Sequence, residues 1–526
     1  MSYIFMKILE QRPESYDAGI SRISGEDWRA VRERIMEGLN PGERVLEIGC
    51  GPGALSVEMA RRGARVTALD INPGMLLFAR GLAAEAKVEI DFKALSAERL
   101  NELEGKWDLI IASLSFSELR PVVRDAVLSR VRLLLSEKGR VVVVDEVMPE
   151  SGWARLRYRV SRLLWGLLAW ARTRKGTTPL SGFDTVLSQQ GYEVKRQELF
   201  PGGNLKLWEA RPLSGFRVPE PETLKGGWGL SDWLENFLIW LTSHFIKIPV
   251  RPGLYKIGSP SPESPLLATS NCSLTVNMVR KYLRGRDAWL LVNDTRGVNV
   301  WCSAGEGNFS ASEIAITLSA SHAEKRVNGR DIILPKLCLN GVKLQDLKAF
   351  SGFKGIIGPV YARDLPAYLD SGLKKTPAME RIDFNFLNRL WFGVPFAILM
   401  SLITGVLALV FHGRLSPYLP LWFAVICMLV SATYTWLPTR RHLVKGLTLG
   451  AIIGAGMVIY LFLKGEPAII MTRSGVLFLL LGLFVTADFS GVTPVSNRTL
   501  VEREFKTIYL LLTVLLTVYL GLAFWK

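Results

Sequence analysis

The stretch Asn299-Val-Trp-Cys-Ser-Ala-Gly305 connects an apolar run to a predicted helix, and this order decides how the middle of the chain folds. The run before it, Trp289-Leu-Leu-Val-Asn-Asp294, has the composition of a short buried strand. A capping-box pattern that begins at Ser310 predicts a helix from Ala311 to His322. Cys302 therefore lies in a strand-to-helix connection, where the backbone can present a side chain to a bound group.

Cys302 is the candidate catalytic and metal-ligating residue of this connection. A thiolate is a soft and strongly donating metal ligand, and a nearby helix N-terminus favours its deprotonated form. The alternative is a small buried cysteine in a packed loop. The residues alone leave both interpretations open.

The motif resembles the cap-helix motif of the mercury-methylating corrinoid proteins, relatives of the corrinoid iron–sulfur protein of acetyl-CoA synthesis. The resemblance covers Pro252 to Met379, including the loop Gly358-Pro-Val-Tyr-Ala362. It implies that Cys302 is the lower axial ligand of cobalt in a cobalamin-type corrinoid. The corrinoid-binding residues that it implies are Asn299, Val300, Trp301, Cys302, Ser303, Ala304 and Gly305.

Two positions depart from the family pattern, which usually has Ala and Lys where this chain has Ser303 and Glu306. The exchange of Lys for Glu reverses a charge beside the corrin, so the resemblance does not identify the final methyl acceptor. Predicted strands and helices alternate through the same region. This alternation favours a parallel sheet with ligand binding at the strand ends.

The composition argues against several other chemistries. The five cysteines are scattered and form no CxxC pair, so neither a disulfide framework nor a ferredoxin cluster is encoded. The four histidines form no zinc motif and no Asp-x-His-x-x-Gly cobalamin signature. The net charge of +16 comes without a recognisable nucleic-acid module, and binding to an anionic membrane leaflet explains it more simply.

An α/β nucleotide-binding unit is predicted from Arg44 onward. The segment Arg44-Val-Leu-Glu-Ile-Gly-Cys-Gly-Pro-Gly53 has the pattern of a buried strand that ends in a glycine-rich turn. The next strand, Arg65-Val-Thr-Ala-Leu-Asp70, ends in a carboxylate. The glycines allow the backbone to approach a ligand closely, and Asp70 is placed to bind ribose hydroxyls.

This GxGxG loop and the following Asp70-Ile-Asn-Pro73 resemble the S-adenosylmethionine (SAM) site of class I methyltransferases, and the resemblance extends from Met6 to Leu213. A NAD-type Rossmann domain, or one that has lost its ligand, is the alternative. The SAM-binding residues that the resemblance implies are Glu47, Gly49, Gly51, Gly53, Asp70 and Ile71. The segment after the fourth strand, Leu114 to Leu119, offers no obvious general base. That would suit an acceptor such as Co(I), which needs positioning rather than proton abstraction.

The C-terminal part is predicted to be a membrane domain of five helices, because five apolar stretches are long enough to cross about 30 Å of hydrocarbon. The stretches are Trp391 to Phe411, Leu419 to Leu437, Leu447 to Leu463, Ile469 to Ala487 and Ile508 to Trp525. The Arg and Lys residues of the connecting loops predict a multi-pass protein of the cytoplasmic membrane. The N-terminal domains would then be cytoplasmic and Lys526 outside.

The predicted fold is thus a Rossmann-like methyltransferase domain (6–213), a linker with an amphipathic segment (214–250), an α/β corrinoid-binding domain (251–380) and an all-α membrane domain (385–526). Within the first domain, the Arg-rich insertion 153–175 suits an interfacial helix, a lid or a packed surface helix.

The predicted function is transfer of a methyl group from SAM to Cys-ligated cobalt and on to an acceptor, which the family resemblance suggests could be Hg(II). The same resemblance implies anaerobic metabolism. Cobalt would need reduction to Co(I), and the sequence encodes no iron–sulfur cluster, so a separate ferredoxin-type iron–sulfur protein is the expected reductant. Membrane lipid is the other expected partner, and nucleic acid is not. In one alternative, the methyltransferase acts on a small molecule or lipid and is merely tethered to a corrinoid carrier fed by methyl-folate. In the other, the second domain is a carrier or sensor without turnover.

Overall fold

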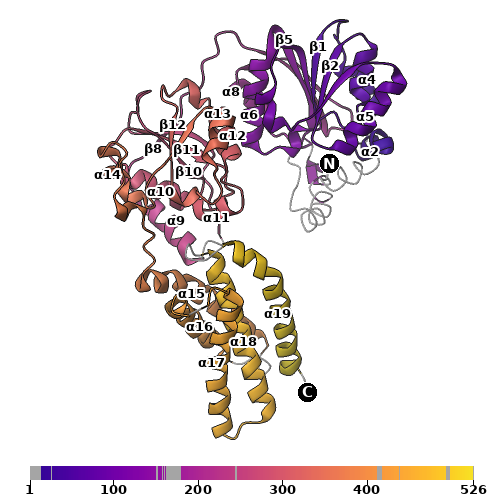
Figure 1. Cartoon of the computed structure of the whole chain (residues 1–526). Coiled ribbons are helices and arrows are strands. Elements are labelled where there is room, and N and C mark those ends of the chain that lie inside the picture. Colours follow the sequence, from indigo (N-terminus) through magenta and orange to yellow (C-terminus); the bar gives the residue numbers. More distant parts are fainter. Residues whose placement is uncertain are drawn as a thin grey trace.

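The computed structural model describes residues 13–24, 27–149, 152–153, 155–156, 158, 160, 179–242, 246–411, 417–437, 439–492 and 498–524. Two α/β domains lie side by side, and a bundle of long helices extends away from the second of them (Figure 1). The predicted insertion helix at 153–175 falls almost entirely outside the described residues.

The first domain is built on a seven-stranded sheet with the order β3-β2-β1-β4-β5-β7-β6. Its first five strands pair in parallel, while β7 and β6 form an antiparallel hairpin at one edge. The strands are β1 (Arg44–Ile48), β2 (Arg65–Asp70), β3 (Ile90–Ala94), β4 (Trp107–Ser113), β5 (Leu135–Glu146), β6 (Tyr192–Leu199) and β7 (Leu205–Pro212). The helices are α2 (Tyr16–Ser24), α3 (Trp28–Ile35), α4 (Ala54–Arg61), α5 (Pro73–Ala86), α6 (Pro121–Leu134) and α8 (Phe183–Gln189), with short turns η1 (Pro13–Ser15), η2 (Ala97–Glu102) and η3 (Phe116–Glu118).

Both faces of this sheet are buried, which explains the uninterrupted apolar runs of its strands. Leu46 and Ile48 belong to the core on one face, and Val45 belongs to the core on the other. The predicted Rossmann-like fold and its closing hairpin are confirmed.

The second domain has a six-stranded sheet with the order β13-β12-β10-β11-β9-β8. The strands are β8 (Thr223–Leu224), β9 (Gly253–Ile257), β10 (Leu266–Ser270), β11 (Ala288–Asn293), β12 (Asp331–Leu334) and β13 (Lys354–Ile357). The helices are α9 (Leu230–Leu241), α10 (Ser273–Tyr282), α11 (Val300–Gly305), α12 (Ala311–Ala320), α13 (Leu344–Ser351) and α14 (Leu365–Asp370), with turns η4 (Ala323–Lys325), η5 (Lys336–Cys338), η6 (Ala362–Asp364) and η7 (Pro377–Glu380).

Four strands, β10 to β13, form the predicted parallel sheet, but β9 runs antiparallel to β11. The expectation of a wholly parallel sheet is therefore wrong at this edge. The connection from β9 to β10 holds no helix, and a parallel crossover needs a dozen or more residues.

The prediction of five membrane spans is also wrong. Among the described residues, four helices are long and apolar enough to cross a membrane, namely α15 (Phe386–Val410), α17 (His442–Leu463), α18 (Ala468–Val492) and α19 (Arg498–Phe524). The remaining helix, α16 (Leu419–Thr433), has 15 residues and a length of about 22 Å, less than the hydrocarbon thickness of about 30 Å.

A residue of the neighbouring helix caps the end of α16. Arg389 of α15 is buried and donates hydrogen bonds to the carbonyls of Ser431 (3.2 Å) and Ala432 (3.2 Å). These are carbonyls of the last turn of α16, which a helix that ends there leaves without intrahelical partners. The sequence shows Arg389 only as a basic residue before the first span, so its capping role could not be predicted.

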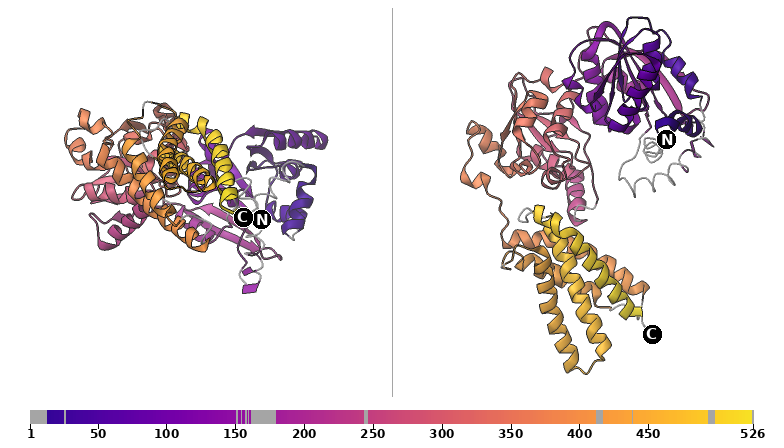
Figure 2. Two further views of the ribbon diagram at one scale, coloured as in Figure 1. Left: turned by 90° about the horizontal axis from the view of Figure 1, so that it is seen from below. Right: turned by 45° about the vertical axis from the view of Figure 1, so that its right-hand side comes forward.

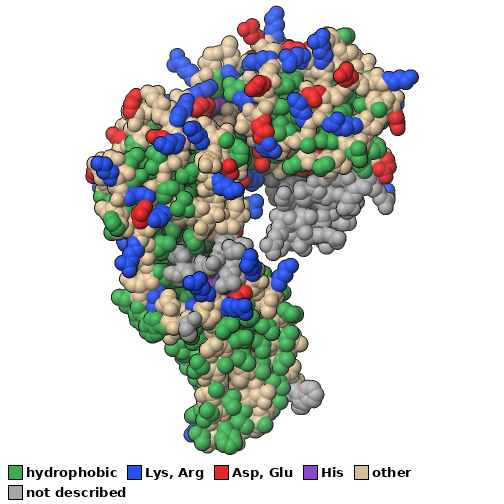
Figure 3. Space-filling view, in the orientation of Figure 1, with side chains coloured by type: hydrophobic (Ala, Val, Ile, Leu, Met, Phe, Trp, Pro, Cys, Tyr) green, Lys and Arg blue, Asp and Glu red, His purple; other side chains and the backbone are tan. Residues whose placement is uncertain are grey.

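The domains meet through specific helices. Helix α6 of the first domain packs against α12 of the second. Helix α9 leads from the second domain toward the long helices (Figures 1 and 2). There, the ring of Trp240 stacks on that of Trp391 in α15, with 4.6 Å between the ring centroids. Figure 3 shows that charged side chains gather on the two α/β domains, while apolar side chains cover the visible face of the helical bundle. This distribution is compatible with a membrane-anchored protein.

Candidate functional site

The predicted SAM loop lies at the carboxyl end of β1, where three glycines adopt the left-handed backbone conformation. The φ angles of Gly49, Gly51 and Gly53 are +77°, +52° and +82°. A Cβ atom on Gly53 would lie 2.6 Å from the Cβ of Ala79 in α5. The loop therefore requires glycine at this position, and its backbone is left open to a ligand.

Asp70 ends β2, and Glu47 lies one residue before the end of β1, from which the loop continues. Asp70 accepts hydrogen bonds from the backbone N–H groups of Gly51 (2.8 Å) and Asn72 (2.7 Å). Glu47 is buried and accepts a hydrogen bond from Ser56 of α4. Asp70 thus fixes the loop in place, and its contact with a ribose stays a prediction.

A cavity of about 40 Å³ lies beside this loop, between Gly49, Gly51 and the aromatic residues Tyr16 and Trp28. Tyr16 belongs to α2 and Trp28 to α3, so both helices lie beside the predicted SAM loop. Ile71, the remaining predicted contact, is 70% exposed at the end of β2.

A buried carboxylate beside the segment Leu114–Leu119 was not singled out from the sequence. Asp145, at the end of β5, is fully buried and accepts hydrogen bonds from the N–H groups of Ser117 (2.9 Å) and Glu146 (2.7 Å). Burial raises the pKa of Asp145 to about 6, although its contacts with Ser117 oppose this. Asp145 therefore holds η3 against the sheet through its hydrogen bond with Ser117. Cys50 lies in the loop, but burial raises the pKa of its thiol well above the usual range, which keeps it protonated.

Cys302 lies on a short helix rather than in an irregular connection. Helix α11 begins after Asn299, whose side-chain oxygen accepts a hydrogen bond from the N–H of Cys302 (2.9 Å). Cys302 itself is half-buried, in the first turn of this helix. The first turn of a helix is the place where backbone dipoles favour an anionic ligand group.

The neighbours of Cys302 hold α11 in position. Ser303 is buried, and its hydroxyl donates to the carbonyl of Asn299 (2.6 Å), so this departure from the family pattern faces the protein interior. A Cβ atom on Gly341 would lie 2.2 Å from the carbonyl oxygen of Ala304, which shows how closely α11 packs on the following loop. Glu306, the charge-reversed position, is exposed at the end of α11.

A cavity of about 430 Å³ opens under α11 at the carboxyl ends of β10 and β12. Asn299, Val300 and Trp301 line it from α11, and Phe392 of α15 contributes from the helical bundle. Most other lining side chains are apolar, among them Leu267, Leu274, Met278, Val279, Ile333, Leu337 and Val360. A pocket of this size with a few polar groups suits a bulky, largely apolar organic group. Cys302 is next to Trp301 but does not line the cavity.

Two buried polar atoms near this sheet edge have no hydrogen-bond partner among the described residues. They are Ser270 Oγ and Asn293 Oδ1, whose residues are register partners at the ends of β10 and β11. Both residues are fully buried and neither lines the cavity, so these atoms do not indicate what the cavity binds. The apolar lining suits an organic group, and a corrinoid at this site stays a prediction.

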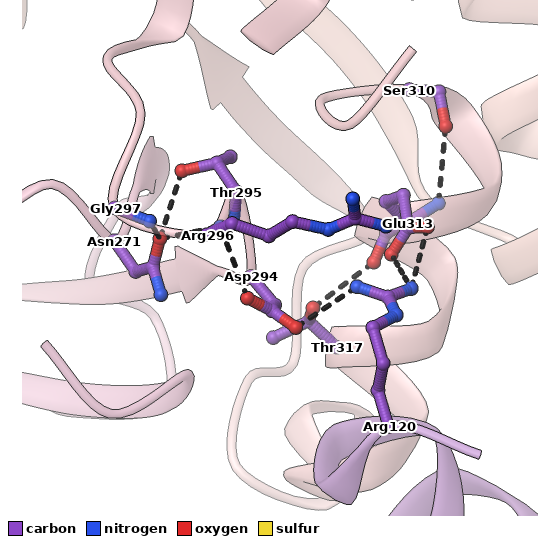
Figure 4. A network of polar contacts seen from close by, with 9 residues as sticks. All are labelled: Arg120, Asn271, Asp294, Thr295, Arg296, Gly297, Ser310, Glu313 and Thr317. Atoms are coloured by element: carbon purple, nitrogen blue, oxygen red, sulfur yellow. Dashed lines mark hydrogen bonds and ion pairs between the residues drawn. The ribbon is translucent and has the colours of Figure 1, made fainter. Parts of the chain in front are cut away.

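One contact between the domains could not be predicted from the sequence. Arg120, which precedes α6, forms ion pairs with Asp294 (2.9 Å) and Glu313 (2.6 Å) of the second domain (Figure 4). Burial lowers the pKa of Arg120, but Glu313 and Asp294 raise it by more. The capping-box spacing indicated Glu313 only as a helix-start residue, so no local signal pointed to this pair.

Comparisons with known proteins match the two α/β domains to two different family models. Residues 45–139 match the model of the methyltransferase domain, and residues 246–368 match the model of the CO dehydrogenase/acetyl-CoA synthase delta subunit. An uncharacterized methyltransferase of Synechocystis is 30% identical over 177 residues, which are 33% of this chain and 77% of the relative. The gamma subunit of the acetyl-CoA decarbonylase/synthase complex of Archaeoglobus fulgidus is 32% identical over 126 residues, 23% of this chain. The match spans only 26% of that subunit.

Among solved structures, the magnesium protoporphyrin IX methyltransferase of Synechocystis with bound S-adenosylhomocysteine is 20% identical, with a TM-score of 0.28. The match covers 40% of this chain and 86% of that protein. The broad resemblance of the second domain to the corrinoid proteins of acetyl-CoA synthesis is confirmed by the family model, while mercury methylation stays a prediction. The chain belongs, through its N-terminal domain, to the SAM-dependent methyltransferase family.

Proposed function

We propose that this chain transfers the methyl group of SAM to the cobalt of a corrinoid held beside Cys302. The first domain would bind SAM at the glycine loop, and the second would bind the corrinoid under α11. Reduced cobalt would supply the electron pair of the new bond, while the pair of the broken carbon–sulfur bond stays on S-adenosylhomocysteine. The proposal includes a separate reductant, of the ferredoxin type, and a later electrophilic acceptor, for which the family resemblance implies Hg(II).

The observation that carries the proposal is the docking of the two α/β domains. Helix α6 starts shortly after the segment Leu114–Leu119, which follows β4 beside the predicted SAM loop. It packs on α12, which follows the helix that carries Cys302. His322 is buried in this contact and bonds Ser129 (3.2 Å) and Gln190 (3.2 Å) of the first domain. Two merely tethered domains would not need a buried polar contact between them.

The two sites also face the same side of the molecule. Helix α2 covers the glycine loop and α11 carries Cys302, and both lie on the sides of their domains nearest the helical bundle (Figure 1). The segment Leu114–Leu119 holds one half-buried carboxylate, Glu118, and Asp145 of β5 beside it is buried. An acceptor that is already a strong nucleophile, as reduced cobalt is, would need positioning and no such base.

Each residue then has a defined task. Gly49, Gly51 and Gly53 give SAM access to the backbone, and Asp70 holds the loop in the required conformation. Asn299 begins α11 and orients Cys302 as the cobalt ligand. A donating thiolate stabilises oxidised cobalt and so favours acceptance of the methyl group.

The test is a single-turnover experiment on the full chain in detergent. The protein is loaded with cobalamin, reduced, and mixed with SAM that carries a labelled methyl group. Label that stays with the protein-bound corrinoid, together with a change in its cobalt absorption, is the expected result. Label that reaches only a separate small molecule or lipid would refute the proposal and favour the tethered methyltransferase.

A further inference from the structure

Arg120 is the charged side chain that joins the methyltransferase domain to the loop before Cys302. Its two terminal nitrogens contact different carboxylates, Asp294 at the end of β11 and Glu313 at the start of α12. The side chains of Arg120, Asp294 and Glu313 are 27%, 16% and 18% exposed. An arginine that bridges two partly desolvated carboxylates fixes distance and direction more firmly than an exposed ion pair.

On one side, Arg120 is attached to the SAM site. It is the N-cap residue of α6, and η3 separates it from Leu114, which lines the small cavity beside the glycine loop. The N–H of Leu114 donates to the carbonyl of Val144 (2.8 Å), and Asp145 holds η3 through Ser117. The segment from Leu114 to Arg120 is therefore tied to the sheet at both β4 and β5.

On the other side, Arg120 is attached to the Cys302 helix. Asp294 also accepts a hydrogen bond from the N–H of Arg296 (3.2 Å), and Asn271 accepts three hydrogen bonds from Thr295 and Gly297 (Figure 4). This turn leads within two residues to Asn299, which caps Cys302. Because hydrogen bonds hold the backbone of this short turn, a shift of Asp294 would also displace α11.

We propose that Arg120 is a positioning residue that sets the separation and orientation of the SAM loop relative to the Cys302 helix. This role rests on the proposed function, because it concerns the transfer of a methyl group between the two sites. A transfer between bound groups is sensitive to misplacement by about 1 Å, which can reduce the rate on the order of 100-fold. Arg120 lines neither the cavity beside the glycine loop nor the cavity under α11, so its effect acts through domain docking.

The experiment compares Arg120→Met with the unmodified full chain, loaded with cobalamin and reduced. Arg99→Met is the matched control, since Arg99 is an exposed arginine whose partner Glu102 lies in the same domain. Three quantities are measured: the SAM affinity, the rate of methyl transfer to the bound corrinoid, and the rate of transfer to excess cob(I)alamin added in solution. Hydrogen exchange of α12 and α11 reports docking without any turnover.

The expected result for Arg120→Met is a loss on the order of 100-fold in transfer to the bound corrinoid, with SAM affinity and transfer to added cob(I)alamin retained. Hydrogen exchange in α12 should become faster, and Arg120→Lys, which keeps one charge, should recover part of the rate. Arg99→Met should match the unmodified chain in every measurement.

Three outcomes would overturn this role. Unchanged transfer and unchanged exchange in Arg120→Met would show that docking does not depend on Arg120. A parallel loss of SAM affinity would show that Arg120 supports only the fold of its own domain. Absence of label on cobalt in the unmodified chain would refute the proposed function itself, and with it the role of Arg120.

Discussion

The buried histidine between the domains predicts that their docking weakens in mild acid. Burial lowers the pKa of His322 from 6.5 to about 4, and the neighbouring cations Lys325, Arg132 and Arg326 add to the effect. The Nε2 atom of the ring faces the side-chain oxygen of Gln190, and Nδ1 faces the hydroxyl of Ser129. The neutral ring, with Nε2–H as donor, satisfies both contacts, so docking favours the uncharged form.

The sign and size of the effect follow from the two pKa values. When the domains separate, His322 becomes exposed to water and its pKa returns toward 6.5. Its contribution to docking is fully present above about pH 6.5 and falls by about 1.4 kcal/mol for each pH unit between about 6.5 and 4. The total loss is at most about 3 kcal/mol, or on the order of 100-fold in the docking equilibrium, because Lys325 and Arg326 stay beside His322 when the domains separate.

The assay is hydrogen exchange of α6 and α12 in the full chain between pH 7.5 and 4.5, compared with His322→Asn. Asparagine does not titrate and tolerates the left-handed backbone of this position, where φ is +49°. The difference between the two chains isolates the histidine, because other titrating groups remain in both. Parallel pH profiles for the two chains would refute the reasoning.

Three further predictions address other sites. Burial raises the pKa of Asp125 in α6 to about 6, although Arg251 and Arg124 oppose this shift. The buried carboxylate therefore lowers the stability of the fold fully above about pH 6, where it is ionised, and not at all below about pH 4. Asp125→Asn should therefore stabilise the chain by about 1–2 kcal/mol at pH 7.5 and hardly at all at pH 4, as chemical denaturation can measure. Asp70→Ala should weaken SAM binding about tenfold or more by releasing the loop at Gly51, and equal affinity by calorimetry would contradict this. Cys302→Ala should leave a folded chain with normal SAM affinity but altered cobalt absorption and little methyl transfer; cobalt spectra like those of the unmodified chain would contradict thiolate ligation.

Local patterns predicted much of the fold because each depends on neighbouring residues alone. The GxGxG loop requires positive φ angles wherever it occurs, and an apolar run between turn residues forms a buried strand in most α/β sheets. The motif at Asn299 likewise placed Cys302 near a helix start, although the structure makes α11 a helix of its own. These features were predicted correctly or nearly so.

Features that join distant parts of the chain could not be predicted in this way. Arg120 is separated by 174 residues from Asp294 and by 193 from Glu313, and neither partner has a local pattern that indicates the other. The end of α16 is capped by Arg389 from another helix, and hydropathy alone counted one membrane span too many. Both errors concern side chains whose partners lie in another element.

The proposed chemistry places one more demand on the contact between the domains. If Cys302 holds the cobalt, the methyl group would have to arrive and depart from a direction that Cys302 leaves open. The methyltransferase domain and the final acceptor then need the same space in turn, so docking has to be reversible. The docking contacts can satisfy this demand, because they can set the geometry while the domains are together and still be released: the side chains of Arg120 and Glu313 are 27% and 18% exposed, and protonation of His322 would cost up to about 3 kcal/mol.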